Sequence, residues 1–256
     1  MDDTHTNVDV GADGGNATPI DARETNAWRG QRVAITGGTS GLGLALVELL
    51  HAQGARVAFV ARDAARVHAV AQRLPGTHGI VGDVADKAAL HAIALQVTSA
   101  LGGLDVLVNN ASSLRPVPLA QLADTECEDF EAALATNLVG PFRLTKAMLG
   151  ALAASARDGR QALVLNISSD AAVNAYAGWG AYGASKAALA HMTRIWDEEL
   201  REHGVRLLAI DPGDMDTPMH AQAVPDEDRA TLKQPATAAC DVLALALDAL
   251  EQEAIA

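Results

Sequence analysis

The chain has 256 residues, 49% of them apolar and 3% aromatic, and its 19 basic and 32 acidic residues give a formal net charge of −13. The apolar content suffices for a sizeable core and excludes wholesale disorder, while the acidic balance argues against nucleic acid as a partner, because phosphate binding needs clustered Lys and Arg. The two cysteines, Cys127 and Cys240, cannot form a disulfide framework, which favours a reducing, cytoplasmic setting.

The first 28 residues are rich in Gly, Asp, Asn and Thr and offer almost nothing to bury. We therefore expect residues 1–28 to form a disordered acidic tail and residues 29–256 to form a single folded domain. The N-terminus lacks the basic and apolar regions of a signal peptide, and no uncharged apolar run reaches the ~18 residues that a membrane span needs. We expect neither a secretion signal nor a membrane anchor.

From residue 32 onward, short β-branched runs alternate with longer Ala- and Leu-rich stretches of helical period. Strands are predicted over residues 33–36, 56–60, 79–81, 105–109, 163–167 and 205–210. Helices are predicted over residues 42–50, 64–74, 87–101, 124–152, 180–203 and 237–253. Several strands are apolar throughout, as expected where helices cover both faces of a sheet. The strict alternation predicts an α/β fold: a single-domain, Rossmann-type doubly wound parallel sheet with helices on both faces.

A glycine-rich turn follows the first predicted strand and opens the first predicted helix, with the sequence Thr36-Gly37-Gly38-Thr39-Ser40-Gly41-Leu42-Gly43. Glycines let the backbone approach a pyrophosphate closely, and the free N–H groups of a helix N-terminus favour its negative charge. The spacing is not the common G-x-G-x-x-G, and no Lys-Ser or Lys-Thr pair follows as in a P-loop. The turn predicts a dinucleotide site; the alternative is a tight turn without a ligand.

The end of the second predicted strand distinguishes between two cofactors. An acid at this position would bind the ribose 2′-hydroxyl of NAD, whereas an Arg suits the 2′-phosphate of NADP. Here Ala61 is followed by Arg62, which can make a bidentate contact with a phosphate, and then by Asp63, which either begins the next helix or repels that phosphate. We predict NADP(H) in preference to NAD(H); the alternative for Arg62 is a solvated surface charge.

The most informative segment runs from Ser169 to Lys186. Tyr182 and Lys186 are four residues apart and share one face of a predicted helix, and Ser169 lies at the carboxyl end of a predicted strand. A nearby ammonium favours the phenolate, so we expect Lys186 to lower the pKa of Tyr182 and make it a proton donor and acceptor near neutral pH. The Ser169 hydroxyl is suited to hydrogen-bond a carbonyl oxygen that is becoming an alkoxide. The alternative interpretation of a Y-x-x-x-K motif by itself is a pair of side chains on the surface of a helix.

In combination, these motifs resemble the short-chain dehydrogenase/reductase family over roughly residues 30–253. The matching stretches are the glycine turn at 36–43, Gly82-Asp83-Val84, Asn109-Asn110-Ala111, Asn137, Ser169, Tyr182, Lys186 and Pro212-Gly213. The resemblance implies a dinucleotide-binding catalytic domain of the NADP-preferring carbonyl reductase type, acting on a small carbonyl or alcohol substrate. A weaker similarity, in the W-x-x-Y spacing and the P-G-x-x-D-T-x-M ending, is to sepiapterin-reductase-like members.

The same resemblance implies a role for each matched position. Ser169, Tyr182, Lys186 and Asn137 would form the catalytic set, with Asn137 holding a water that passes protons to Lys186, and Lys186 binding the nicotinamide ribose. Asn109 would steady the sheet. The implied cofactor contacts are Gly37, Thr39, Ser40, Gly41, Leu42 and Gly43 around the pyrophosphate, Asp83 and Val84 at the adenine, Asn110 and Ala111 near the ribose, and Pro212, Gly213 and Thr217 at the nicotinamide.

The chain departs from the family pattern in three places. Ser112 stands where the family usually has Gly after Asn-Asn-Ala, which adds a side chain beside the cofactor. Thr39 and Ser40 stand in the turn where many NADP-preferring members carry a basic residue, so the NADP prediction rests on Arg62. The family commonly has a seventh strand after the last helix, whereas this sequence ends at Ala256; either that strand is absent or a tail is missing.

Residues 214–234 are long and polar and follow the sixth predicted strand, where the family has its substrate lid. We predict a substrate loop there, with an apolar wall from Met215, Met219 and Val224 and with Trp179 and Tyr176 nearby. The alternatives are a mobile surface loop and, for Trp179, ordinary helix packing.

The predicted function is hydride transfer between NADP(H) and a carbonyl or alcohol, with Tyr182 as general acid or base. The eight His residues form no H-E-x-x-H pair and no Cys-x-x-Cys is present, so no metal site is predicted. A non-catalytic NADP(H)-binding regulator and an isomerase or dehydratase with transient hydride transfer are the alternatives. By the resemblance, helices around 124–150 and 180–203 would pair across subunits into a homodimer or homotetramer.

Overall fold

The computed structural model describes residues 27–254, and six strands within that range form one parallel sheet in the order β3-β2-β1-β4-β5-β6. The strands are β1 (Arg32–Thr36), β2 (Arg56–Ala61), β3 (His78–Val81), β4 (Val106–Asn109), β5 (Leu163–Ile167) and β6 (Arg206–Ile210). Val33 of β1 pairs with Val57 of β2 on one side and with Val106 of β4 on the other. The strand order therefore reverses at β1, and in such sheets a crevice opens at the carboxyl ends of the strands. The predicted fold class is confirmed.

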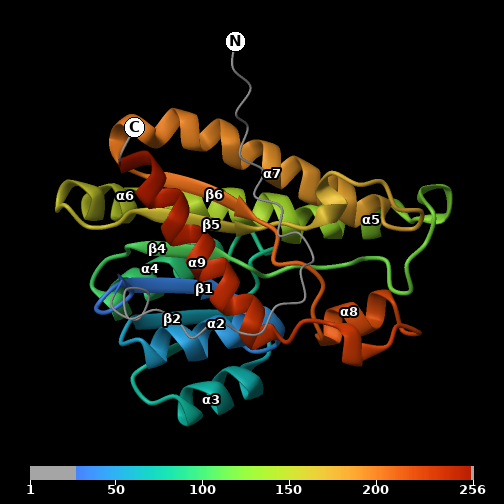
Figure 1. Ribbon diagram of the computed structural model, residues 1–256, viewed down its shortest axis with the longest axis horizontal. Helices are drawn as coiled ribbons and strands as arrows, with labels where there is room; N and C mark the ends of the chain where they lie inside the picture. Colours follow the sequence, from blue (N-terminus) through green and yellow to red (C-terminus); the bar gives the residue numbers. More distant parts are fainter. Residues whose placement is uncertain (1–26, 255–256) are drawn as a thin grey trace.

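Helices cover both faces of the sheet (Figure 1). One face carries α2 (Gly41–Ala52), α3 (Ala64–Arg73) and α9 (Pro235–Ala254), and the other carries α4 (Leu90–Leu101), α6 (Gly140–Arg157) and α7 (Gly180–Leu200). Of the remaining helices, α5 (Cys127–Leu134) packs on α7, and the short α8 (Pro218–Ala223) lies beyond one end of the sheet (Figure 1). Because α8 follows β6, it lies at the end of the sheet where the strands have their carboxyl ends.

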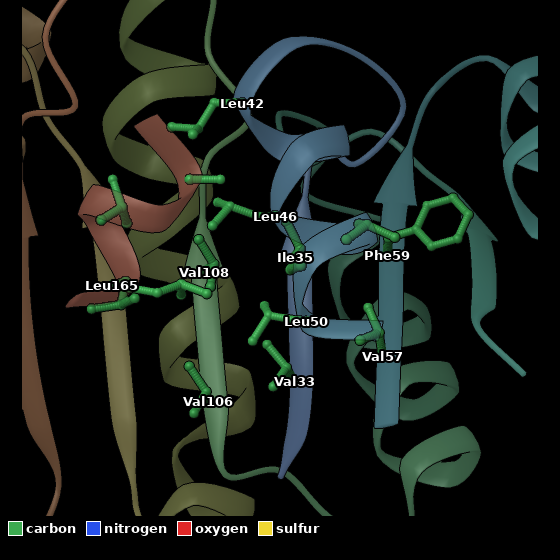
Figure 2. Packing of buried hydrophobic residues seen from close by; sticks show 14 of the residues in the cluster. Val33, Ile35, Leu42, Leu46, Leu50, Val57, Phe59, Val106, Val108 and Leu165 are labelled. Atoms are coloured by element: carbon green, nitrogen blue, oxygen red, sulfur yellow. The ribbon is translucent and has the colours of Figure 1, made fainter. Parts of the chain in front are cut away.

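Alternate side chains of each strand feed two separate cores. On β1, Val33 and Ile35 face α2 and α9, whereas Ala34 between them faces the side of α4 and α6. Figure 2 shows Leu46 and Leu50 of α2 packed over β1. Since both faces are covered, strands need apolar residues at every position, which explains their unbroken apolar runs.

The predicted helical region 124–152 is helical from Cys127 onward, but its hydrogen bonding is not that of one regular α-helix. A single 3₁₀ turn (Leu122–Asp124) precedes α5, and a π-helical turn (Ala135–Val139) separates α5 from α6. Pro141 lacks the N–H that would bond the carbonyl four residues earlier, and the N–H of Gly140 instead donates to the carbonyl of Ala135, five residues away. The helical period of the apolar residues gave no sign of this π-turn, which contains Asn137.

Two predicted boundaries also change. Trp28, which the prediction assigned to the tail, is 1% exposed and belongs to the core beneath α2 and α9, so the folded domain begins before residue 29. The rest of the predicted tail, residues 1–26, lies outside the described residues. Within the predicted loop 214–234, α8 and a 3₁₀ turn (Arg229–Thr231) are present, and the N–H of Asp216 donates to the carbonyl of Lys233 at 2.9 Å, which holds the two ends of the loop together.

Between residues 27 and 254 no helix has both the length and the apolar character needed to cross a bilayer.

Candidate active site

One cavity of about 1220 Å³ opens at the carboxyl ends of the strands. Its walls come from the turn after β1, the ends of β2, β4 and β5, the first turns of α7 and the segment after β6. Of the predicted site residues, those that line it are Gly37, Thr39, Ser40, Gly41, Leu42, Gly43, Arg62, Asp83, Val84, Asn110, Ala111, Ser169, Tyr182, Lys186, Pro212, Gly213 and Thr217. Asn137 is the one predicted residue that does not line the cavity.

The glycine turn has a shape that excludes side chains. Gly37 has φ +72°, and a Cβ on Gly43 would collide with the carbonyl oxygen of Gly37. Asn110 holds the turn, because its Nδ2 donates to the carbonyl of Thr36 at 2.9 Å. The Thr36 hydroxyl in turn accepts the N–H groups of Asn110 and Ala111, both at 3.0 Å. The end of β4 therefore fixes the turn in place without any ligand.

The N-terminus of α2 has no internal partner for its positive end. Ser40 occupies the capping position without a side-chain hydrogen bond, and the first turn of α2 contains no acid. The first N–H groups of a helix lack intrahelical acceptors, and here they border the cavity beside three glycines. The arrangement fits the pyrophosphate of a dinucleotide, which could approach the backbone here at no steric cost.

The end of β2 resolves the role of Asp63. Its carboxylate accepts the N–H of Arg66 at 3.1 Å as the N-cap of α3, and its second oxygen lies 3.5 Å from Nε of Arg66. Asp63 thus begins the next helix, one of its two predicted alternatives. Arg62 and Arg66 are both exposed and both line the cavity. Sequence reasoning missed Arg66, although its position four residues after Arg62 at the start of a helix was a usable signal.

The three predicted reacting groups meet in this cavity. Tyr182 and Lys186 lie in the first turns of α7, and Ser169 follows β5. Nζ of Lys186 donates to the carbonyl of Ile167 at 2.7 Å and lies 5.5 Å from the centroid of the Tyr182 ring. The Ser169 hydroxyl lines the same cavity as the Tyr182 phenol and donates to Oδ1 of Asp170 at 3.1 Å. It also accepts the N–H of Ala171 at 3.2 Å, which fixes its position at the end of the strand.

The predicted lowering of the Tyr182 pKa by Lys186 is wrong for this chain by itself. Burial raises the pKa of Tyr182 to about 12, because the phenolate would lose its water, and the carboxylates of Asp211 and Asp170 act in the same direction. The Ser169 and Ser112 hydroxyls oppose this rise. Burial also lowers the pKa of Lys186 to about 8, although Asp211 favours the ammonium. Desolvation therefore outweighs the attraction that the four-residue spacing suggested.

Asn137 is buried behind the cavity wall. Its Nδ2 donates to the carbonyl of Ser113 at 2.8 Å and to the Ser185 hydroxyl at 2.9 Å, and its Oδ1 accepts the N–H of Ser113 at 2.8 Å. The side chain thus ties the segment after β4 to α7, which carries Tyr182. The water-mediated link to Lys186 stays a prediction. Asn109 has a similar structural role, since its Nδ2 donates to Oδ1 of Asn166 on the adjacent strand at 2.8 Å.

The apolar side of the cavity is where the sequence placed it. Met215, Met219 and Val224 line the cavity, together with Trp179 and Tyr176. The Trp179 ring stands edge-on to the Tyr182 ring, with centroids 5.6 Å apart, so Trp179 forms a wall beside the phenol as well as packing on the helix.

Acidic side chains that were not predicted as site residues also line the cavity, among them Asp170, Asp214 and Glu227. The Tyr176 hydroxyl donates to Oδ2 of Asp170 at 2.6 Å. His220 lies between the other two, with Nε2 2.6 Å from Oε2 of Glu227 and Nδ1 3.8 Å from Oδ1 of Asp214. Sequence reasoning treated this stretch only as polar loop; the signal it passed over was the excess of acids in residues 214–228.

Comparison with known proteins agrees with this geometry. The family model described as short chain dehydrogenase matches residues 31–228. The chain is 33% identical over 207 residues to an L-fucose dehydrogenase of Mus musculus, covering 80% of this chain and 73% of that protein. It is 32% identical over 207 residues to a 3-oxoacyl-acyl-carrier-protein reductase of Vibrio cholerae, covering 80% and 82%. The solved structure of an alcohol dehydrogenase from Thermococcus sibiricus, complexed with 5-hydroxy-NADP, superposes with a TM-score of 0.74 at 25% identity, covering 84% and 90%.

Proposed function

Because the chain belongs to the short-chain dehydrogenase family and is thereby a hydride-transfer oxidoreductase, we propose that Ser169, Tyr182 and Lys186 form its catalytic centre, supported by Asn137. One observation carries the proposal: these three side chains share a single cavity with an uncapped helix N-terminus and a turn whose Gly37 and Gly43 have no room for a Cβ. The proposed reaction is the reversible reduction of a carbonyl to an alcohol with NADP(H).

The nicotinamide cofactor, when bound, supplies or accepts the hydride. The chain's own residues handle the substrate oxygen. The Ser169 hydroxyl donates a hydrogen bond to that oxygen and orients it, and Tyr182 Oη gives it a proton as the carbon gains hydride. Lys186, held by the carbonyl of Ile167 at 2.7 Å, places a cation beside the phenol as negative charge develops there.

The protonation state of Tyr182 supports carbonyl reduction at neutral pH. With its pKa raised to about 12 by burial, the phenol carries its proton throughout the physiological range. The proton donor is therefore present before the substrate binds. Alcohol oxidation needs the phenolate as proton acceptor. In that direction the Ser169 and Ser112 hydroxyls matter more, because they lower the pKa of Tyr182.

NADP(H) rather than NAD(H) is the proposed cofactor. Arg62 and Arg66 both line the cavity at the end of β2, and the acid between them in the sequence, Asp63, caps α3 and lies 3.5 Å from Nε of Arg66. Two guanidinium groups suit a 2′-phosphate, and the strand end offers no free carboxylate to hold a ribose 2′-hydroxyl.

The proposed substrate is an uncharged, hydroxylated carbonyl compound of sugar type. Asp170, Asp214 and Glu227 line the cavity, with His220 between two of them. Carboxylates accept hydrogen bonds from hydroxyl groups and repel anions. Among the relatives, this favours a neutral hydroxylated substrate like that named for the L-fucose dehydrogenase.

A homodimer or homotetramer in the cytoplasm completes the proposal. Phe142 of α6 stacks on Trp196 of α7 with centroids 5.2 Å apart, and Phe142 and the nearby Ile195 remain partly exposed. An exposed apolar patch across two long helices suits a subunit contact. Cys127 and Cys240 are free thiols, which suits a reducing compartment.

The test is oxidation of NADPH, followed by its absorbance, with a panel of aldoses, ketoses, simple ketones, quinones and acyl thioesters. We expect turnover with neutral hydroxylated carbonyls, and the Tyr182→Phe variant should lose about 10³-fold in kcat while its NADPH affinity stays within about twofold. Tight NADPH binding with no turnover on any member of the panel would favour the non-catalytic regulator. A product formed without net cofactor use would favour the isomerase or dehydratase.

A further inference from the structure

The Ser169 hydroxyl, which the proposed mechanism directs at the substrate oxygen, already has an acceptor in the structure. It donates to Oδ1 of Asp170 at 3.1 Å, and its oxygen accepts the N–H of Ala171 at 3.2 Å. An ionised carboxylate can only accept, so the direction of the first bond is fixed. Because a serine hydroxyl has a single proton, that proton belongs to the bond with Asp170 until a substrate binds.

The Asp170 carboxylate is also held through its second oxygen. Oδ2 accepts the Tyr176 hydroxyl at 2.6 Å, and the Tyr176 ring stands edge-on to the Trp179 ring with centroids 6.5 Å apart. The three side chains all line the cavity. Since the phenol of Tyr176 bonds Oδ2, Oδ1 is the oxygen that Asp170 presents to Ser169.

The backbone of Asp170 is fixed against the helix that carries Tyr182. Asp170 begins a 3₁₀ turn that follows β5. A Cβ on Gly183 of α7 would lie only 3.0 Å from the carbonyl oxygen of Ala171 in that turn, so the turn and α7 are in close contact. Backbone packing therefore keeps Asp170 beside the reacting groups.

Substrate binding takes a donor away from Asp170. When Ser169 turns its proton to a substrate oxygen, Oδ1 of Asp170 loses the hydroxyl that it accepts at rest. An unpaired charged acceptor costs free energy, which a substrate offsets by supplying a donor of its own. Oxygens on neighbouring carbons come as close together as two hydrogen-bonded oxygens, and the two protein oxygens that would hold them are 3.1 Å apart. A hydroxyl next to the carbonyl thus fits the pair formed by Ser169 and Asp170.

From this geometry we infer that Asp170 is a specificity-determining residue, which selects carbonyl compounds that carry a hydroxyl on the carbon next to the carbonyl. The carbonyl oxygen accepts the Ser169 hydroxyl, and the neighbouring hydroxyl donates to Oδ1 of Asp170 in its place. Tyr176 is a positioning residue, because it holds Oδ2. The inference rests on the proposed function, since it names the substrate class of that site.

The neighbouring hydroxyl takes no part in bond changes. In carbonyl reduction the hydride joins the carbonyl carbon, the proton of Tyr182 joins the carbonyl oxygen, and Asp170 gains no proton. Two related classes of compound fit less well. A simple ketone supplies no donor for Oδ1, and an α-keto acid places a carboxylate where the hydroxyl would lie, so that two like charges repel.

The kinetic test compares acetoin (3-hydroxybutan-2-one) with butan-2-one, which differ only in the hydroxyl on the neighbouring carbon. With NADPH we expect kcat/KM to be about 10- to 100-fold higher for acetoin, because it adds a hydrogen bond to a charged acceptor. Asp170→Ala removes that acceptor and should bring the two values within about twofold of each other. Tyr176→Phe frees Oδ2 and should lower the ratio by about threefold.

The matched control is Asp214→Asn. It removes a carboxylate that lines the same cavity but lies beside His220, and it should leave the ratio of acetoin to butan-2-one within about twofold of its original value. Affinity for NADPH and the melting temperature show that each variant is folded. An equal loss for both substrates in Asp170→Ala would overturn the inference, because a structural role alone explains it. A ratio near one in the unsubstituted protein would overturn it as well.

A binding measurement makes the inference independent of turnover. With NADPH bound, butane-2,3-diol and butan-2-ol cannot be oxidised, so their dissociation constants, followed by NADPH fluorescence, report recognition alone. The diol should bind about 10-fold more tightly to the unsubstituted protein and within about twofold of butan-2-ol to Asp170→Ala. A preference for the diol that survives in Asp170→Ala would overturn the inference. Absence of turnover with every substrate counts against the proposed function, while the diol comparison still decides the role of Asp170.

Discussion

The two ends of the sheet treat buried charge in opposite ways. At the amino ends of the strands, Asp105 is fully buried, and the guanidinium groups of Arg32 and Arg160 both hydrogen-bond it, with Arg160 Nη2 at 2.7 Å. The N–H of Arg32 adds a third donor at 2.8 Å. Although burial favours the neutral acid, the bonds from Arg160 and Arg32 hold the pKa of Asp105 well below its ordinary range.

At the carboxyl ends, burial is not compensated in this way. Lys186 is 3% exposed and has one carbonyl as its partner, and burial lowers its pKa to about 8. Burial likewise raises the pKa of Tyr182 to about 12. The same desolvation therefore yields a stabilising ion cluster where donors are plentiful and a reactive pair where they are few. Substitutions at the two ends should separate stability from activity.

The largest expected effect is on catalysis. Lys186→Met keeps the length of the side chain and removes its buried cation, so we expect kcat to fall by about 10³-fold while the melting temperature changes by only a few degrees. Steady-state kinetics and thermal unfolding of the same preparation check this. A loss of stability as large as that of the Asp105 variant below would contradict the comparison.

A substitution at the other end of the sheet, where the strands begin, should change stability and leave activity intact. Asp105→Asn leaves two guanidinium groups facing a neutral amide, and we expect the free energy of unfolding to fall by about 3 kcal/mol with kcat/KM of the folded protein unchanged. Urea unfolding measures the difference. Asp124→Asn, at an exposed position, is the matched control and should change stability by less than about 0.5 kcal/mol.

The pH dependence of that difference has a definite sign. Because the pKa of Asp105 is lower in the folded than in the unfolded chain, its contribution to stability is present above the unfolded pKa of about 4 and is lost as the pH falls toward the folded value. The difference in unfolding free energy between the original protein and Asp105→Asn should be constant from about pH 5 to about pH 8 and should shrink below about pH 4. A gap that widens in acid would refute the assignment.

A smaller effect, on cofactor affinity, is expected from the two arginines at the end of β2. Replacing Arg62 and Arg66 together by Ala should raise the KM for NADPH by about 10- to 100-fold and change that for NADH by less than about twofold, because only NADPH carries the 2′-phosphate. Arg73→Ala, on the same helix but paired with Glu48 at 2.6 Å, is the control. Equal weakening of both cofactors would argue against the proposed NADP preference.

The smallest effect concerns the acidic wall. The double variant Asp214→Asn, Glu227→Gln removes two negative charges from the cavity, so kcat/KM for an anionic ketone should rise by about three- to tenfold relative to a neutral ketose. The neighbouring Asp226→Asn removes a charge that does not line the cavity and should leave that ratio within about twofold. An unchanged ratio in the double variant would show that these carboxylates do not select the substrate.

Much of the fold and of the site was predictable because it depends on local spacing. The strand at residues 163–167 has the predicted bounds, and the glycine turn lies where a strand ends and a helix begins. Strand alternation then brings Ser169 and Tyr182 to one edge of the sheet, since parallel strands end together. Two features departed from the prediction: Trp28 packs into the core under α9, and a π-helical turn just before Pro141 interrupts the regular α-helical hydrogen bonding.

The sequence by itself determined which groups could react: a phenol and an amine four residues apart, a serine at a strand end, and a glycine turn at a helix start, because these follow from helical and strand periods. Only the tertiary structure decided in which protonation state those groups rest and what surrounds them. Burial, which no local pattern encodes, reversed the expected pKa shift of Tyr182. The hydrogen bond from Ser112 to Asn137, and the presence of Asp170, Asp214 and Glu227 in one cavity, likewise arise because the fold brings distant segments to the same edge of the sheet.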